Sequence, residues 1–258
     1  MIPKVIHYCW FGRGEKPELA KKCIASWEKY CPDYEIIEWN EDNFDINCCD
    51  YVREAYEAGK WAFVSDYARL WIIYNYGGIY LDTDVEIIKR LDSLLSHRAY
   101  FARESAEHIA TGLGFGAESR HPAVKALMDE YKTIHFLRDG ILDTTPCPIR
   151  NTAALKKLGL KDFDKHQILS NDTHVYPSRY FSPINAATGI ERRSYVTMTV
   201  HHFASSWMTE EERKLFEQRQ RNKRLQEQEK RKKLPNRIVK HILGDDRYSR
   251  IKSKIKKN

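Results

Sequence analysis

Apolar and polar residues follow two patterns along the first 85 positions, one typical of strands and one typical of helices. Short apolar or alternating runs predict strands at Lys4–Tyr8, Tyr34–Trp39 and Ile79–Val85. Helical spacing predicts helices from Pro17 to about Cys31, at Tyr51–Ala58 and at Trp61–Tyr76. Since strands and helices follow each other in turn, we expect an α/β fold with a Rossmann-like, mainly parallel sheet flanked by helices.

The pattern is weaker beyond Val85, but it still alternates between the two kinds of element. We expect strands at Ala99–Arg103, near Leu113–Ala117 and at Val196–Phe203, and helices near His121–His135 and Thr152–Leu158. From Thr209 the chain changes to a long polar helical pattern, which opens with the capping pair Thr209 and Glu212. Pro235 is expected to break this helix.

Charge changes at the same point as the hydrophobic pattern. The whole chain of 258 residues has a net charge of +7, yet residues from Thr209 onward hold 18 Lys and Arg against 8 Asp and Glu. The first 208 residues are therefore slightly acidic, and a tail makes the protein basic. We predict a folded domain at residues 1–208 and a basic helical C-terminal extension at residues 209–258.

The last part of the extension combines basic residues with a narrow apolar stripe. Ile238, Val239, Ile242 and Leu243 share one helical face, and Ile251 and Ile255 repeat that spacing among lysines. This pattern favours the surface of an anionic membrane as a partner. The alternative is a solvated tail that packs on its own domain or on a second subunit. Nucleic acid ranks last, because Tyr248 alone could stack on bases after Phe216.

Composition narrows the class of protein further. Hydrophobic residues make up 42% of the chain and aromatic residues 12%, which indicates a folded core. No apolar run approaches the roughly 20 residues of a membrane-spanning helix, and the N-terminus lacks the pattern of a signal peptide. We expect a cytoplasmic protein, bound peripherally to the inner face of the membrane if the tail acts there. The adjacent Cys48 and Cys49 suit a reducing compartment.

Two acidic residues follow the apolar run at residues 79–81. Alternation along a strand would point Asp82 and Asp84 to one side, at the sheet edge where α/β folds bind ligands. Two close carboxylates repel each other unless a cation lies near, and oxygen ligands suit Mn²⁺ or Mg²⁺. Taken alone, the pair is a weak signal and is more simply explained as the end of a strand in a solvated turn. Asp66 and Arg69, one helical turn apart in an apolar helix, favour a partly buried site.

Three blocks of residues together resemble one enzyme family. The blocks read Ile2-Pro3-Lys4-x-Ile6-His7-x-x-Trp10, then Ser65-Asp66-x-x-Arg69 with Gly77-Gly78-x-Tyr80-x-Asp82-x-Asp84, and finally His202-Phe203-Ala204-Ser205-Ser206-Trp207. They are similar to the signature of glycosyltransferase family 32, a group of DxD-containing retaining sugar transferases. That family includes yeast mannosyltransferases and bacterial capsular polysaccharide enzymes, and the clostridial glucosylating toxins share its pattern. The resemblance implies a GT-A type fold.

The resemblance also implies a role for each matching residue. Asp82 and Asp84 would bind Mn²⁺ or Mg²⁺ together with His202, for which His201 is the rival ligand. Since alternation sends two adjacent histidines to opposite faces, only one of them should serve. The other roles concern the donor: Asp66 and Arg69 would hold sugar hydroxyls, Trp10 and Tyr80 would line the nucleotide site, and Ser205 and Trp207 would reach the diphosphate.

The activity implied is transfer of a hexose from a nucleoside diphosphate sugar, with a UDP-sugar favoured, to a saccharide or lipid-linked saccharide acceptor. Synthesis of capsular or other surface polysaccharide is the expected setting. Relatives often have an asparagine within the segment Thr111–Ala117, whereas this chain has none, which leaves the donor sugar open. Two alternatives remain: a metal-dependent phosphatase, and a degenerate, non-catalytic module that presents its basic tail to a membrane or nucleic acid.

Overall fold

A computed structural model describes residues 1–205, 208 and 210–243, with side chains described up to residue 230. Contacts divide these residues into two compact units. Residues 1–184 and 191–205 form the first unit, which holds every predicted site residue that is described. Residues 185–190 belong to the second unit, together with the helix α6 (Glu210–Leu243).

Within the described residues, seven strands form the main sheet of the first unit. They are β1 (Val5–Cys9), β2 (Glu35–Trp39), β3 (Gly78–Tyr80), β5 (Ala99–Ala102), β6 (Phe115–Ala117), β9 (Gln167–Leu169) and β10 (Thr173–Tyr176). Their order across the sheet is β2-β1-β3-β6-β5-β10-β9. β1 is parallel to β2 and β3, β5 is parallel to β10, and β6 and β9 are antiparallel to their neighbours. Five strands therefore run in one direction.

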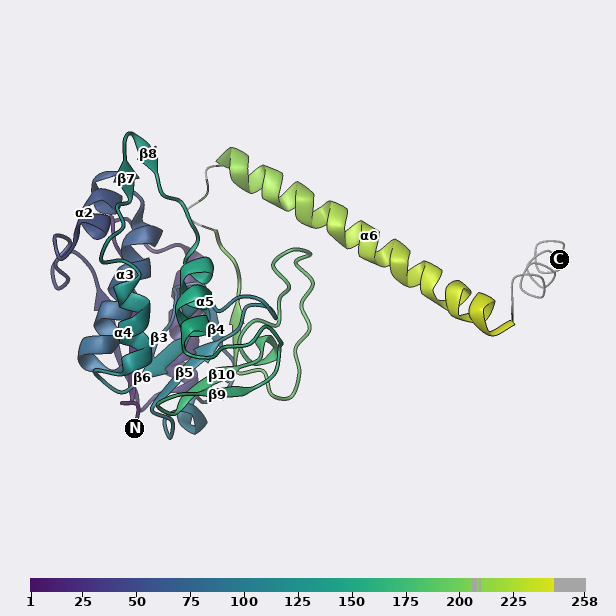
Figure 1. Ribbon diagram of the computed structural model, residues 1–258, viewed down its shortest axis with the longest axis horizontal. Helices are drawn as coiled ribbons and strands as arrows, with labels where there is room; N and C mark the ends of the chain where they lie inside the picture. Colours follow the sequence, from purple (N-terminus) through teal and green to yellow (C-terminus); the bar gives the residue numbers. More distant parts are fainter. Residues whose placement is uncertain (206–207, 209, 244–258) are drawn as a thin grey trace. The chain divides into compact units, whose positions relative to one another are not determined.

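Helices cover both faces of this sheet. They are α1 (Glu18–Tyr30), α2 (Asp50–Glu57), α3 (Trp61–Tyr76), α4 (Pro122–Asp129) and α5 (Cys147–Lys157). Figure 1 shows α3, α4 and α5 side by side in one layer, and contacts pair α3 with α4 and α4 with α5. Helix α1 contacts the strand β4 (Val85–Ile87), which pairs with β11 (Thr199–His201). The predicted α/β class and GT-A type architecture are confirmed, as a mixed sheet flanked by helices.

Alternation along the strands divides the core in two. In β5, Ala99 and Phe101 pack into one cluster with the helices α2–α5, while Tyr100 and Ala102 pack into the other. The second cluster contains Trp27 of α1, which is fully buried and donates its indole N–H to the carbonyl of Val85 at 2.7 Å. The inner strands β1, β3 and β5 therefore contribute to a core on each face, which explains why their apolar runs are nearly continuous.

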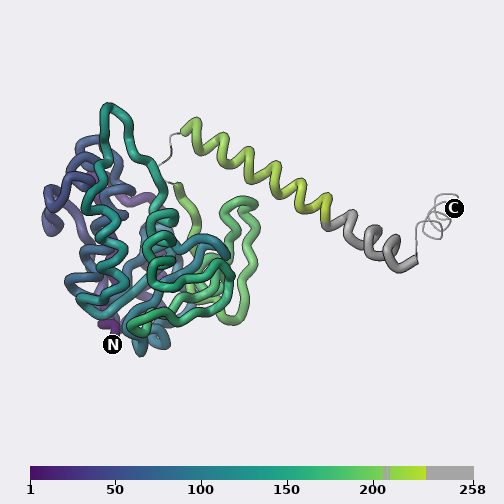
Figure 2. The backbone as a smooth tube through the Cα atoms, viewed as in Figure 1, coloured from purple at the N-terminus to yellow at the C-terminus, as the bar shows by residue number. Residues whose placement is uncertain are grey.

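The remaining elements are short. They are the 3₁₀ turns η1 (Asp92–Leu94), η2 (Thr111–Leu113) and η3 (Ser178–Tyr180), and the strands β7 (Leu137–Arg138) and β8 (Ile141–Leu142). β7 and β8 form a hairpin that projects from the helical layer, as the backbone trace makes clear (Figure 2).

The predicted strand Ile79–Val85 is wrong in its second half. β3 ends at Tyr80, and the chain turns before β4 begins at Val85. The Asp82 N–H donates to the carbonyl of Gly112, and the Val85 N–H donates to the carbonyl of Asp82. The backbone groups of Asp82 are thus used in a turn and in a contact with η2, so strand alternation does not set the directions of the two carboxylates.

The expected break at Pro235 is also wrong, since α6 runs without interruption from Glu210 to Leu243. A proline inside a helix removes one backbone hydrogen bond and bends the axis, but good helix formers on either side can continue the helix. Within the second unit, Gln220 and Arg224 donate to the carbonyls of Ala186 and Thr188 at 2.6 and 2.9 Å. None of the described helices has the length and apolar character needed to cross a membrane. Ile251 and Ile255 lie outside the described residues.

Candidate active site

The carboxyl ends of β1, β2 and β3 lie together at one end of the sheet, here called its carboxyl edge, because these strands are parallel neighbours. Trp10 follows β1 there, and the turn with Asp82 and Asp84 follows β3. Such an edge is where open α/β sheets bind ligands, since the strands stop and the connecting loops leave room. The two aspartates therefore occupy a ligand-binding position even though they lie in a turn.

Asp82 is held by two groups from buried residues. Its Oδ1 accepts a hydrogen bond from the Tyr80 hydroxyl at 3.1 Å and pairs with Arg69 Nη2 at 3.1 Å. Its Oδ2 lies so close to Gly112 that a Cβ at that position would collide with it. The approach of the carboxylate to the η2 backbone thus requires glycine at position 112.

Helix α3 supplies the cation of the site. Arg69 is 4% exposed and joins two carboxylates, since its Nη2 also lies 3.2 Å from Asp66 Oδ1. Burial raises the pKa of Asp66 to about 6, although the nearby Arg69 acts in the opposite direction. Arg69 Nη1 also lies 3.8 Å from Cys147 Sγ, at the start of α5. The pair predicted on one helical face is therefore buried and directed at the acidic turn.

Asp84 faces a different set of partners, from the last residue of β11 and the segment that follows it. Its Oδ1 lies 3.1 Å from His201 Nε2, and its Oδ2 accepts the backbone N–H of Ala204 at 2.8 Å. Burial alone would raise the pKa of Asp84, but these two contacts outweigh it and lower the pKa to about 2. Asp84 is an anion at neutral pH, which is the form that binds a metal.

The structure reverses our preference between the two histidines. His202 Nε2 lies 2.9 Å from Glu86 Oε2, and His201 is the one that joins Asp82 and Asp84. As alternation predicts, the two adjacent side chains reach different carboxylates. β11 pairs antiparallel with β4 in a register that sets His201 opposite Val85, directly after Asp84, so His201 rather than His202 lies beside the two aspartates.

Asp82, Asp84 and His201 fit a divalent cation. One ligand atom from each lies within 4.8 Å of the others. His201 Nδ1 is buried and has no hydrogen-bond partner among the described residues, and the ring packs on Phe203 with the two ring centres 4.2 Å apart. Two carboxylates and an imidazole suit Mn²⁺, and Mg²⁺ accepts the same oxygens.

Trp10 and Ser205 have contacts of their own. Trp10 donates its indole N–H to the carbonyl of Gly14 at 2.6 Å and borders a hollow of about 250 Å³ with Lys16 and Glu38. Ser205 adopts a positive φ of 49° and donates its hydroxyl to the carbonyl of Phe203, next to the Ala204 contact with Asp84. Trp207 lies outside the described residues.

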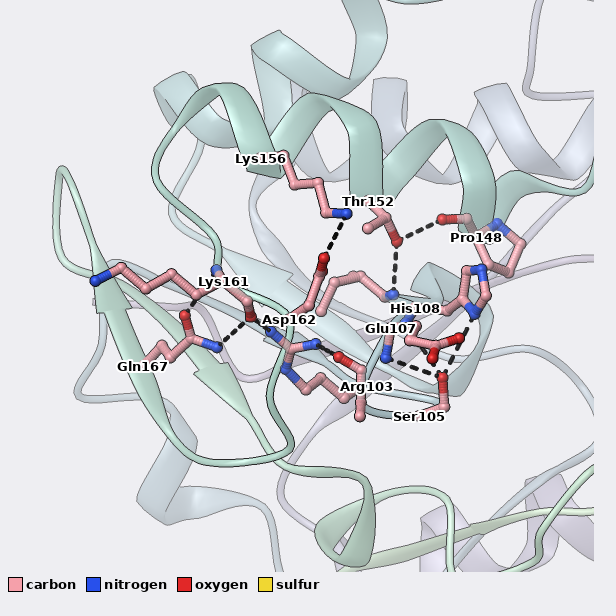
Figure 3. A network of polar contacts seen from close by, with 12 residues as sticks. Arg103, Ser105, Glu107, His108, Pro148, Thr152, Lys156, Lys161, Asp162 and Gln167 are labelled. Carbon is pink, nitrogen blue, oxygen red and sulfur yellow. Dashed lines mark hydrogen bonds and ion pairs between the residues drawn. The ribbon is translucent and has the colours of Figure 1, made fainter.

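A polar network fixes the loop after β5 against α5 (Figure 3). Arg103 is fully buried and donates to the carbonyls of Ala106 and Lys161. Thr152 of α5 accepts the N–H of Ile109 at 2.9 Å. This network leads the chain into η2, where the hydroxyl of Thr111 accepts from the buried amide of Asn151 at 3.0 Å.

Gly112, Cys147 and Asn151 were missing from the predicted site. Gly112 lies against Asp82, Cys147 against Arg69, and Asn151 against Thr111 of η2. These contacts form only in the folded chain, because α5 and η2 are distant in sequence from α3. The run of glycines at residues 112–116 was the one sequence signal that pointed to this place. Asn151 supplies a buried amide beside Thr111, in a chain that lacks the asparagine expected within Thr111–Ala117.

Part of the chain is similar in sequence to known proteins. Residues 17–101 match the family described as a glycosyltransferase sugar-binding region containing a DXD motif, which confirms the resemblance found in the sequence. Inositol phosphoceramide mannosyltransferase 3 of Schizosaccharomyces pombe is 32% identical over 129 residues, which are 47% of this chain and 35% of that protein. Mannosyl phosphorylinositol ceramide synthase SUR1 of Saccharomyces cerevisiae is 28% identical over 151 residues, which are 53% and 38% of the two chains.

The chain thus spans little more than a third of the length of these curated relatives. Among solved structures, a glycosyltransferase involved in the glycosylation of the major capsid of PBCV-1 is similar with a TM-score of 0.45 and 14% identity. The match covers 83% of this chain and all of that one.

Proposed function

Residues 17–101 belong to the family of glycosyltransferase sugar-binding regions that contain a DXD motif, and on this premise we propose that the protein is a metal-dependent glycosyltransferase. It moves a hexose from a nucleoside diphosphate sugar to an acceptor hydroxyl, with retention of the anomeric configuration. The observation that carries the proposal is the meeting of Asp82, Asp84 and His201 at the carboxyl edge of β3, beside the buried Asp66–Arg69 pair.

The reaction breaks the bond between the anomeric carbon and the diphosphate, whose oxygen keeps the electron pair. A divalent cation held by Asp82, Asp84 and His201 would neutralise the charge on that leaving group. Arg69 is buried and fixed by two carboxylates, so it can hold donor hydroxyls without reorganising. The acceptor oxygen forms the new bond to the anomeric carbon, and its proton passes to the departing diphosphate oxygen.

The donor is expected to place its base beside Trp10 and its sugar beside Asp66 and Arg69. Tyr80 is buried against this region, where its ring lies under Arg69 with the guanidinium carbon 5.0 Å from the ring centre. A UDP-sugar is our proposed donor. The two named relatives are mannosyl-transferring enzymes, so a mannose nucleotide is the alternative that the assay must include.

The acceptor is proposed to be a saccharide or a lipid-linked saccharide in surface polysaccharide synthesis. The ceramide named in both relatives supports the lipid-linked form. The basic extension would bring the enzyme to an anionic membrane on the cytoplasmic side. In a liposome pelleting assay with full-length protein and a variant truncated after residue 208, only the full-length protein should pellet with anionic vesicles. Equal pelleting would contradict the membrane role.

A panel of sugar nucleotides tests the enzymatic proposal. Purified protein is incubated with UDP- and GDP-linked hexoses, with Mn²⁺ and with EDTA, and released nucleoside diphosphate is measured. We expect release from one donor that depends on Mn²⁺ and is lost in Asp84→Asn. The matched control is Asp33→Asn, which changes an aspartate that pairs with Lys4 and Arg90 outside the site.

Two outcomes would overturn the proposal. Phosphate release from simple monoesters, without cleavage of any sugar nucleotide, would indicate the phosphatase alternative. Absence of turnover with every donor, while tail-dependent membrane binding persists in Asp84→Asn, would indicate the non-catalytic module.

A further inference from the structure

His97, Asp172 and His174 gather near the amino ends of β5 and β10, and His166 contacts His174 from the start of the antiparallel neighbour β9. His97 precedes β5, Asp172 precedes β10, His174 lies within β10, and His166 precedes β9. β5 and β10 run in the same direction as β3, so their amino ends lie at the end of the sheet away from the carboxyl edge, where Asp82 lies. The cluster is therefore separate from the candidate active site.

The side chains of this cluster are close enough to share one ion. One ring nitrogen of His97, one of His174 and a carboxylate oxygen of Asp172 all lie within 4.8 Å of one another. His174 Nε2 is 3.0 Å from Asp172 Oδ1. Neighbouring ligands of a tetrahedral zinc ion lie about 3.3 Å apart, given bonds of about 2.0 Å, so this pair already has nearly the required spacing.

Outer partners hold both histidines in place. His174 Nδ1 lies 3.0 Å from His166 Nε2, and His97 Nε2 lies 2.8 Å from the Tyr176 hydroxyl. Metal-binding histidines are usually oriented by such a hydrogen bond at the second ring nitrogen. The rings of His97 and His174 stack nearly face to face, with their centres 3.6 Å apart, so one ring has to rotate before both can bind the same ion.

The backbone also shapes the site. Asn171 and Asp172 both have positive φ, at 57° and 53°, in the turn that joins β9 to β10. The Arg98 N–H donates to Asp172 Oδ2 at 3.0 Å, which leaves Oδ1 toward His174. Asp172 remains 44% exposed on its side chain, so an ion can reach it from solvent.

We propose that His97, Asp172 and His174 form a second metal site, which binds Zn²⁺ or a similar divalent ion that prefers imidazole ligands. Water completes the coordination. Two imidazoles and one carboxylate are common zinc ligands, whereas the acid-rich site at Asp82 and Asp84 suits Mn²⁺ or Mg²⁺. The ion would tie the segment before β5 to the β9–β10 hairpin and so stabilise that end of the sheet.

Calorimetric titration with ZnCl₂ tests this site, using untagged full-length protein at pH 7.5. The Asp84→Asn background removes the first site from the measurement. We expect one equivalent of Zn²⁺ to bind in that background, with the affinity lowered about tenfold or more by His97→Gln or Asp172→Asn. Asp172→Asn is nearly isosteric and partly exposed, so it should leave the fold intact. His135→Gln, which changes an exposed histidine elsewhere, should leave zinc binding unchanged.

Cobalt absorption supplies an independent measurement, because Co²⁺ bound by imidazole and carboxylate absorbs in the visible range in a way that reports its ligands. The spectrum should appear in Asp84→Asn and disappear when His174→Gln is added. Failure of Zn²⁺ to bind in the Asp84→Asn background would overturn the proposal. The proposal would also be overturned if the His97→Gln, Asp172→Asn and His174→Gln variants had the same zinc affinity and cobalt spectrum as the Asp84→Asn background.

Discussion

His7 should make the folded protein sensitive to mild acid. This histidine of β1 is 2% exposed, and both of its ring nitrogens are used. Nδ1 accepts the indole N–H of Trp39 at 3.0 Å, so Nε2 carries the proton and donates it to the carbonyl of Gly77 at 3.0 Å. A second proton on the ring would sit on Nδ1 and face the indole N–H of Trp39, so that hydrogen bond would be lost. The neutral ring therefore fixes the glycine turn that leads into β3.

The size of the effect follows from the pKa of His7. Burial lowers it from 6.5 to about 4, although the bond to Gly77 acts in the opposite direction. Because the pKa of His7 is lower in the folded protein than in the unfolded chain, the unfolded chain takes up the proton more readily between pH 6.5 and about pH 4. Stability is thus complete above pH 6.5 and is lost as the pH falls toward 4. The total is about 3 kcal/mol, of which about 2 kcal/mol is lost by pH 5.

Urea unfolding at pH 7.5 and pH 5.0 measures this loss. We expect the free energy of unfolding of the native protein to fall by about 2 kcal/mol more than that of His7→Gln, which has an amide in place of the titrating ring. In the control His135→Gln the effect should have the opposite sign, because Glu54 raises the pKa of His135. Equal pH dependence in the native protein and His7→Gln would refute the reasoning, as would an NMR titration of His7 near pH 6.5.

Four substitutions test the candidate site. Asp84→Asn should lower Mn²⁺-dependent turnover about 100-fold or more, while circular dichroism shows the protein still folded at the assay temperature. Gly112→Ala should displace the Asp82 carboxylate and weaken donor binding by about 1–3 kcal/mol, measured as a rise in KM; an unchanged KM would contradict the close approach. His201→Asn should reduce Mn²⁺ affinity about 10- to 100-fold, whereas His202→Asn should not, and equal losses would contradict the assignment.

Local patterns were enough to predict most elements of the sheet. The helix predicted at Trp61–Tyr76 has those bounds in the structure, and β1, β2 and β5 lie within a residue of their predicted ranges. Helical spacing and strand alternation are properties of neighbouring residues, so the sequence alone determines them. The same holds for Asp66 and Arg69, which the helix must place on one face whatever surrounds it.

Contacts between distant segments decided the rest. Pairing of Asp82 with the η2 backbone turned a predicted strand into a turn, and the register of β11 against β4 selected His201 over His202. The gathering of His97 with Asp172 and His174 also depends on the neighbouring β5 and β10, which are about 70 residues apart in the chain. A sequence fixes the periodicity of each segment, but the hydrogen bonds that join distant segments form only when the whole sheet is assembled, and those bonds set where side chains meet.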